Sequence, residues 1–368
     1  MSLLETAHRD ASSPDEGVRL AALARKAVYL ARRGDREASN QAATELRTKF
    51  SSSYYTAAIA RANLIEGVSA FCDLDFAGAA DKLRRATAMS NSIGDQQLRR
   101  WCESWQTHIQ FSLARFGAAL EIALRLVQEA SASEHSCHSR LGSTVASVIH
   151  YFGRYDLARP WYEYSRWHAT SEGDDLTIDV VLHNTAAYDL NNLRLAEIES
   201  ERDQEDLRRV ALELSSSINY DRMKSPTSFR WMLPLLDFHL SLLRNDFSTA
   251  ADQIDSWLKS FSEAAPKRLV CIAHSDLALC AASCERKHDA IEGMRRATEA
   301  LPSDATPDDR AILFFRCSQI ARLTHEDAAA VDFEMRAKDH LAEFRLQQAH
   351  FIPAFAALVR PNIGRGQD

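Results

Sequence analysis

The chain has 368 residues, 46% of them hydrophobic and 26% charged, with a formal net charge of -7. Such a composition is typical of a globular protein with ample apolar material for a core. The net negative charge disfavours direct binding to nucleic acid, because proteins that bind it usually carry a basic surface. Only 12 Gly and 9 Pro are present; sheets and long loops need more, so we predict an almost wholly helical protein.

The sequence predicts a cytoplasmic protein without a membrane span. Residues 1–16 are polar, lack the apolar run of a secretory signal, and are expected to form a flexible arm. No run of 18 uninterrupted apolar residues occurs. The seven cysteines are an odd number and most of them fall within predicted helices, which indicates reduced, buried thiols.

A repeated pattern organises the rest of the chain. An anchor residue is followed by a small residue three positions later and often a bulky one four positions further, as in Phe76-x2-Ala79-x3-Leu83. The spacing predicts helix–turn–helix units, because the small residue lets the second helix approach the first. Within each half of the chain the anchors lie 39 or 40 residues apart: Arg36, Phe76, Phe116 and Tyr155, then Phe247, Lys287 and Asp327.

Glycines keep the same period. Ser92-Ile-Gly-Asp95 and Ser171-Glu-Gly-Asp174 are 79 residues apart. Gly94 and Gly173 are interpreted as helix C-caps, since glycine enters the left-handed conformation at no steric cost.

The repeat spacing breaks once, between Tyr155 and Phe247. We predict repeats over 17–214, a loop or hinge at 215–228 that is rich in Ser and Pro, and further repeats over 229–345. The extra residues of 195–228 form either a loop or a longer helix. Residues 346–368 are expected to be a capping helix and a tail.

Three segments carry a family resemblance: Tyr151-Phe-Gly-Arg-Tyr155-x2-Ala158-x3-Tyr162, Ala27-x2-Leu30-x3-Gly34-Asp35 and Leu182-x-Asn184-x-Ala186. They resemble the tetratricopeptide repeat family over roughly residues 18–345, although the period is longer than the usual 34. The resemblance implies an all-α, right-handed α-solenoid of about eight TPR-like helical hairpins plus a C-terminal capping helix. It also implies that the first helices line a concave groove that takes peptides.

Polar residues counted back from the anchors are the candidates for that groove: Arg61, Arg140, Tyr151, His183, Asn184, Asn191, His239, Arg316 and Gln319. Arg and Asn fix a peptide backbone or a carboxylate by directional hydrogen bonds. We therefore expect a short ligand, acidic or carboxylate-terminated, that touches Arg140, His183, Asn184 and His239 together. Hydrated polar surface is the alternative for each residue.

An aromatic cluster lies on one face of the third unit's first helix: Trp101, Trp105 and His108. Packing against the neighbouring unit is our first interpretation, and a ligand platform facing the groove is the second.

No metal, cofactor or catalytic site is predicted. His135-Ser-Cys137-His138 lacks a second pair of ligands, and Cys280-x3-Cys284 does not have the spacing of a zinc knuckle. No glycine-rich phosphate loop or nucleophile elbow occurs. The acid pairs Asp174-Asp175 and Asp308-Asp309 are placed at helix starts, where they favour the macrodipole.

The leading hypothesis is a non-enzymatic scaffold that binds a peptide or protein partner in its groove. The alternative is a regulatory sensor that responds to a peptide or small ligand. An enzyme with a site in the groove is the third.

Overall fold

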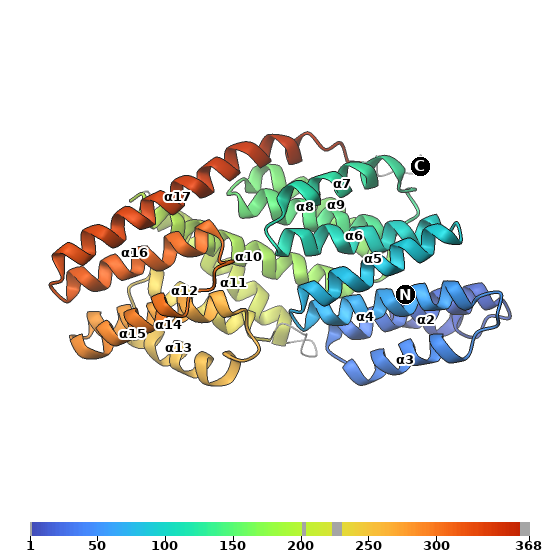
Figure 1. Ribbon diagram of the computed structural model, residues 1–368, viewed down its shortest axis with the longest axis horizontal. Helices are drawn as coiled ribbons and strands as arrows, with labels where there is room; N and C mark the ends of the chain where they lie inside the picture. Colours follow the sequence, from blue (N-terminus) through green and yellow to red (C-terminus); the bar gives the residue numbers. More distant parts are fainter. Residues whose placement is uncertain (1, 201–203, 223–229, 361–368) are drawn as a thin grey trace.

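The computed structural model describes residues 2–200, 204–222 and 230–360. These residues form 17 α-helices and no strand (Figure 1). The predicted all-α class is therefore confirmed.

The first ten helices run through the N-terminal half of the chain. They are α1 (Leu3–Asp10), α2 (Glu16–Arg33), α3 (Arg36–Thr48), α4 (Tyr55–Cys72), α5 (Phe76–Ser92), α6 (Gln96–Ser112), α7 (Phe116–Glu129), α8 (His135–Tyr151), α9 (Tyr155–Glu172) and α10 (Asp175–Ile198).

The C-terminal half contains the other seven. They are α11 (Gln204–Arg222), α12 (Met232–Leu243), α13 (Phe247–Phe261), α14 (Lys267–Ser283), α15 (Lys287–Glu299), α16 (Pro307–Leu323) and α17 (Asp327–Ala356).

Helices α2 to α17 form eight consecutive pairs, and the sequence anchors mark them. Each of the seven anchors is the first residue of the second helix of a pair, as Phe76 is of α5 and Phe247 of α13. The small residue three positions on is fully buried in both, at Ala79 and Ala250. The pattern therefore marks the close approach of two helices, as predicted from its spacing. Gly173 is the left-handed C-cap of α9, with a φ of 76°.

The N-terminal segment differs from the expected flexible arm. Residues 3–10 form α1, whose Leu3 and Ala7 are buried. Ser2 and Glu5 form a reciprocal capping box at its start, and the Leu3 backbone N–H donates to the carbonyl oxygen of Gly173 at 3.1 Å. Leu3 also packs with Tyr29 of α2 and Leu176 of α10, so α1 is held against the distant turn between α9 and α10.

Where the structure describes them, the extra residues predicted at 195–228 lie mainly in long helices. Helix α10 has 24 residues. Helix α11 continues through residues 215–222, where the sequence predicted the start of a loop. The serines there remain helical because their hydroxyls donate to the preceding turn, as Ser216 does to the Leu212 carbonyl oxygen at 2.9 Å. Residues 223–228 of the predicted loop lie outside the described residues.

The predicted capping helix is the end of α17, which continues without a break to Ala356. Figure 1 shows α17 running from the C-terminal hairpins back across the N-terminal half, where it contacts α7 and α8. Phe344 and Phe355 of α17 are fully buried in one apolar cluster with Phe116 and Phe152. The tail, 361–368, lies outside the described residues.

Helix α10 lies at the centre of the molecule. It contacts its neighbours α8, α9, α11 and α12, and also α2, α16 and α17, which are far from it in the chain. The two ends of the repeat array therefore meet the same helix. This closure positions the candidate site.

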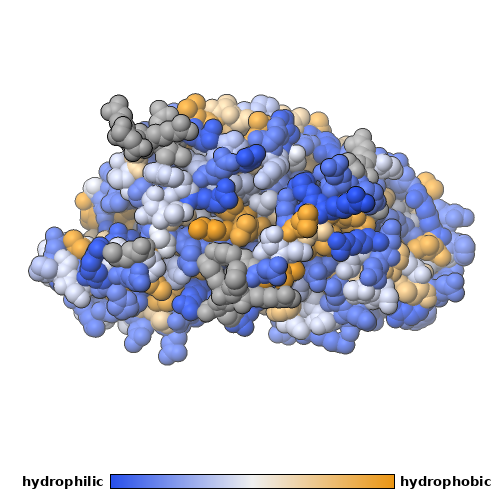
Figure 2. All heavy atoms as spheres, turned by 180° about the vertical axis from the view of Figure 1, so that it is seen from behind, coloured by the Kyte–Doolittle hydropathy of each residue, from blue (hydrophilic) through white to orange (hydrophobic). Residues whose placement is uncertain are grey.

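The outer surface is mostly hydrophilic. Apolar side chains appear in small groups between polar ones on the face opposite to that of Figure 1 (Figure 2). Among the described residues, none of the helices is long and apolar enough to cross a bilayer.

The contact between α8 and α9 requires glycine at 142. A Cβ there would lie 3.0 Å from Cδ1 of Tyr164 and 3.2 Å from the backbone N of Ser165. We expect Gly142→Leu to lower the free energy of unfolding by about 1–3 kcal/mol, because overpacking forces the helices apart. Gly117→Ala is the control, because a Cβ there meets nothing within 4 Å, and it should raise stability by about 0.5–1 kcal/mol. Urea unfolding measures both, and equal effects would contradict the close approach.

Candidate functional site: a recess at the closure of the array

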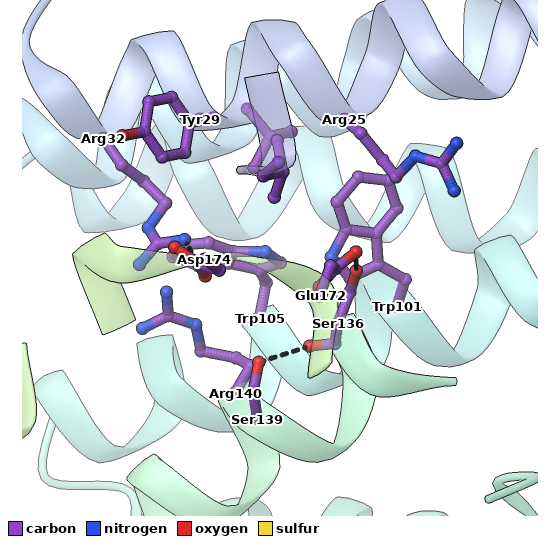
Figure 3. Close-up of a pocket in the computed structure, with 12 residues that line it drawn as sticks. Arg25, Tyr29, Arg32, Trp101, Trp105, Ser136, Ser139, Arg140, Glu172 and Asp174 are labelled. Carbon is purple, nitrogen blue, oxygen red and sulfur yellow. Dashed lines mark hydrogen bonds and ion pairs between the residues drawn. The ribbon is translucent and has the colours of Figure 1, made fainter. Parts of the chain in front are cut away.

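A recess lies where the first hairpin closes onto the turn between α9 and α10 (Figure 3). From α2 come Arg25, Tyr29 and Arg32, whose spacings of four and three place them on one helical face. From α6 come Trp101 and Trp105, one turn apart. The recess is small, with a cavity volume of about 20 Å³, and it opens to solvent.

Helix α8 and the α9–α10 turn form the opposite side. Ser136, Ser139 and Arg140 lie on one face of α8, and Glu172 and Asp174 flank the turn. The Ser136 hydroxyl donates to the Glu172 carboxylate. Burial raises the pKa of Glu172, and the nearby Asp174 charge adds to this.

Asp174 makes the closing contact. Its Oδ1 accepts from the backbone N–H of Thr177 at 3.3 Å and so caps α10. Its Oδ2 accepts from Nη1 of Arg32 and from the Thr177 hydroxyl, both at 2.6 Å. Burial alone would raise the pKa of Asp174, but the charge of Arg32 and the Thr177 hydrogen bond hold it below its usual value. Next to it, the Tyr29 hydroxyl donates to Oδ1 of Asp175 at 2.8 Å.

Arg140 differs from the other charged groups of the recess. The residue is only 4% exposed, and its Cζ lies 3.9 Å from the centre of the Trp105 ring, a cation–π contact. Within the described residues its guanidinium makes no hydrogen bond or ion pair, and its Nε is buried without a partner. Burial, with the repulsion of Arg32, lowers the pKa of Arg140 to about 9. Figure 3 shows its side chain directed toward Asp174.

The arrangement offers a forked donor on an aromatic wall, which suits a planar anion. Within the described ranges, no three His, Cys, Asp or Glu side chains are grouped to hold a metal ion.

Three of the predicted site residues meet in this recess: Trp101, Trp105 and Arg140. His108, the third member of the aromatic cluster, lies beside it, with Nδ1 3.2 Å from the Thr144 hydroxyl. Trp105 fits both the packing and the ligand-platform interpretation, because it is buried in the core and also lines the recess.

Two further predicted residues meet at Asp308, at the start of α16. The Tyr151 hydroxyl donates to its Oδ1 at 2.6 Å, and Nδ2 of Asn191 donates to its Oδ2 at 3.1 Å. Burial and the adjacent Asp309 raise the pKa of Asp308. This cluster joins α8 and α10 to α16.

Three more of the predicted site residues lie around Asp276, which is fully buried on α14. They are His239, Arg316 and Gln319. Arg194 donates to both carboxylate oxygens at 2.8 and 2.9 Å, and Nε of Arg316 donates to Oδ1 at 3.2 Å. His239 lies 3.5 Å from Oδ2, and Gln319 accepts from Arg316 at 2.8 Å. Burial acts to raise the pKa of Asp276. The neighbouring positive charges, that of Arg194 above all, outweigh it and lower the pKa to about 2.

The remaining candidates are placed elsewhere. Arg61 pairs with Asp95 at 2.8 Å, Asn184 donates to the Ser147 hydroxyl at 3.0 Å, and His183 is buried. The expectation of one surface shared by Arg140, His183, Asn184 and His239 is not met. Three of the four are buried, because side chains of other units pack over them, as Arg194 and Asp276 do at His239.

The sequence reasoning missed the residues that other parts of the chain bring to the recess: Leu3, Arg25, Val28, Tyr29, Arg32, Ser136, Ser139, Glu172 and Asp174. Two signals were present. Arg25, Tyr29 and Arg32 share a helical face, and Asp174 was placed correctly at a helix start.

No model of a known protein family matches this sequence, and no curated protein is significantly similar to it.

Histidines of several buried clusters are held neutral. Burial lowers the pKa of His108 to about 3, with the charges of Arg140 and Arg32 adding to it. His168 faces His135 with their Nδ1 atoms 2.9 Å apart, and burial, with the neighbouring His138, lowers its pKa to about 3. Burial likewise lowers the pKa of His239 to about 4, aided by Arg194.

These shifts predict a loss of stability in acid. Below pH 6.5 the unfolded chain protonates these histidines while the folded chain does not, so stability falls as the pH drops from about 6.5 to 4. Each histidine contributes a slope of up to about 1.4 kcal/mol per pH unit. Urea unfolding at several pH values measures the slope. His168→Leu should flatten it and His288→Gln, at an exposed position, should not; an unchanged slope in His168→Leu would refute the assignment.

Proposed function

We propose that this chain is a non-enzymatic, cytoplasmic regulatory protein of TPR-like repeats that responds to a small ligand or the end of a peptide. The observation that carries the proposal is the position of the recess. Its walls come from α2 and from the α9–α10 turn, whose residues Arg32 and Asp174 are 142 positions apart. A ligand seated there contacts both sides of the closure, and so its binding favours the closed array.

The burial of the predicted groove supports a small ligand over a long peptide. An extended peptide needs a row of accessible side chains, whereas His239 and Arg316 are turned into the cluster around Asp276. Seven cysteines without a disulfide are in keeping with a reducing compartment.

A scaffold for a protein partner is the second candidate function. It is favoured by apolar side chains along the outer side of α17, where Val331, Met335 and Leu346 are exposed.

The test is amide hydrogen exchange of the whole chain, with and without the low-molecular-weight extract of cells that make it. The extract should slow exchange in α1 and α2, because a ligand in the recess holds the first hairpin closed. Arg140→Met is the control, in which the extract should have no effect.

A different exchange pattern would contradict the sensor proposal. If the extract leaves α1 and α2 unchanged, and the high-molecular-weight fraction protects α17 instead, the sensor proposal is wrong and the scaffold is favoured.

A further inference from the structure

We infer that the recess binds a carboxylate group, with the Arg140 guanidinium as its donor. The inference rests on the proposed function for the place of the site and goes beyond it by naming the chemistry of the ligand. The carboxylate belongs either to a small organic acid or to the C-terminus of a peptide.

The arginines of the recess are paired with one exception. Arg25 lies 3.1 Å from Asp10, and Arg32 lies 2.6 Å from Asp174. Arg140 has no such partner among the described residues, although it is nine-tenths buried. A buried charge without a partner is costly to a fold. A ligand with one negative charge removes that cost, and the recess has no other uncompensated donor of this kind.

The surroundings of Arg140 orient such a ligand. The guanidinium stacks on Trp105, which leaves the donors at its edge available to a planar, forked acceptor. Ser136 and Ser139 are not competing donors, since the first donates to Glu172 and the second to the carbonyl oxygen of Ser136. Trp101 and Leu3 add apolar wall for the rest of the ligand.

The nearby acids limit the charge that the site accepts. Glu172 and Asp174 both line the recess, so the second charge of a phosphate has no cation to meet and is repelled by both carboxylates. A monocarboxylate is therefore the ligand class that the recess fits.

The probe is sodium acetate, titrated at constant ionic strength against chloride, with binding followed by thermal shift and by tryptophan fluorescence. Acetate should bind saturably in the millimolar range, in keeping with its few atoms. Acetamide, which is neutral, and phosphate should bind at least tenfold more weakly.

Two arginine variants make the test specific. Arg140→Met keeps an apolar side chain against Trp105 and should abolish acetate binding. Arg61→Met removes an arginine that already pairs with Asp95 and should leave binding unchanged. Arg140→Lys keeps the charge without the fork and should weaken binding; it also serves if Arg140→Met does not fold. Equal acetate binding in the wild type and in Arg140→Met overturns the inference, as does the absence of any acetate effect on the wild type.

Short peptides with free or amidated C-termini identify the source. Tighter binding of the free peptide than of acetate indicates a peptide terminus, and exclusion of both peptides indicates a small acid. The two proposals fail separately. Acetate binding at Arg140 without slower exchange in α1 and α2 refutes the sensor alone, whereas an extract effect without acetate binding refutes the carboxylate alone.

Discussion

The closure of the repeat array depends on one buried carboxylate. Asp174 is the N-cap of α10 and accepts hydrogen bonds from Thr177 of that helix and from Arg32 of the first hairpin. Because the same side chain caps a helix and pairs with a distant unit, the start of the central helix and the position of α2 are fixed together. The recess, its arginines and the placement of α1 against Gly173 all follow from that junction.

In this closed repeat array, polar side chains of the inner face form contacts within the protein. Polar side chains that would line an open groove instead meet charges from other units, as Arg194 and Arg316 do at Asp276. Removing one member of such a buried cluster leaves an unpaired charge, which typically costs about 3–5 kcal/mol. The clusters therefore hold the helices in one register, and Arg140 stands apart because the protein supplies it with no carboxylate partner.

The local structure was predictable from the sequence, and the closure was not. Small residues such as Ala79 and Ala250 report a contact between helices that adjoin in the chain, so the anchors marked the start of each second helix. Periodicity also placed Trp101, Trp105 and Arg140 on inward faces. It carries no information on which helix covers a face, so the pairing of Arg32 with Asp174 and the burial of His239 could not be inferred. The helix at Leu3 was missed although its capping box was present in the sequence.

We expect the fold itself not to need the charge of Arg140, which is buried without an ion-pair partner. The most direct measurement is the free energy of unfolding of ligand-free Arg140→Met and Arg61→Met, obtained by urea titration beside the wild type. Arg61→Met should lose up to about 1 kcal/mol, because Asp95 is left without its partner. Arg140→Met should be as stable as the wild type or more stable by about 1 kcal/mol or more, because a buried unpaired charge is removed. A loss in Arg140→Met larger than that in Arg61→Met would show that the arginine is structural and contradict the account.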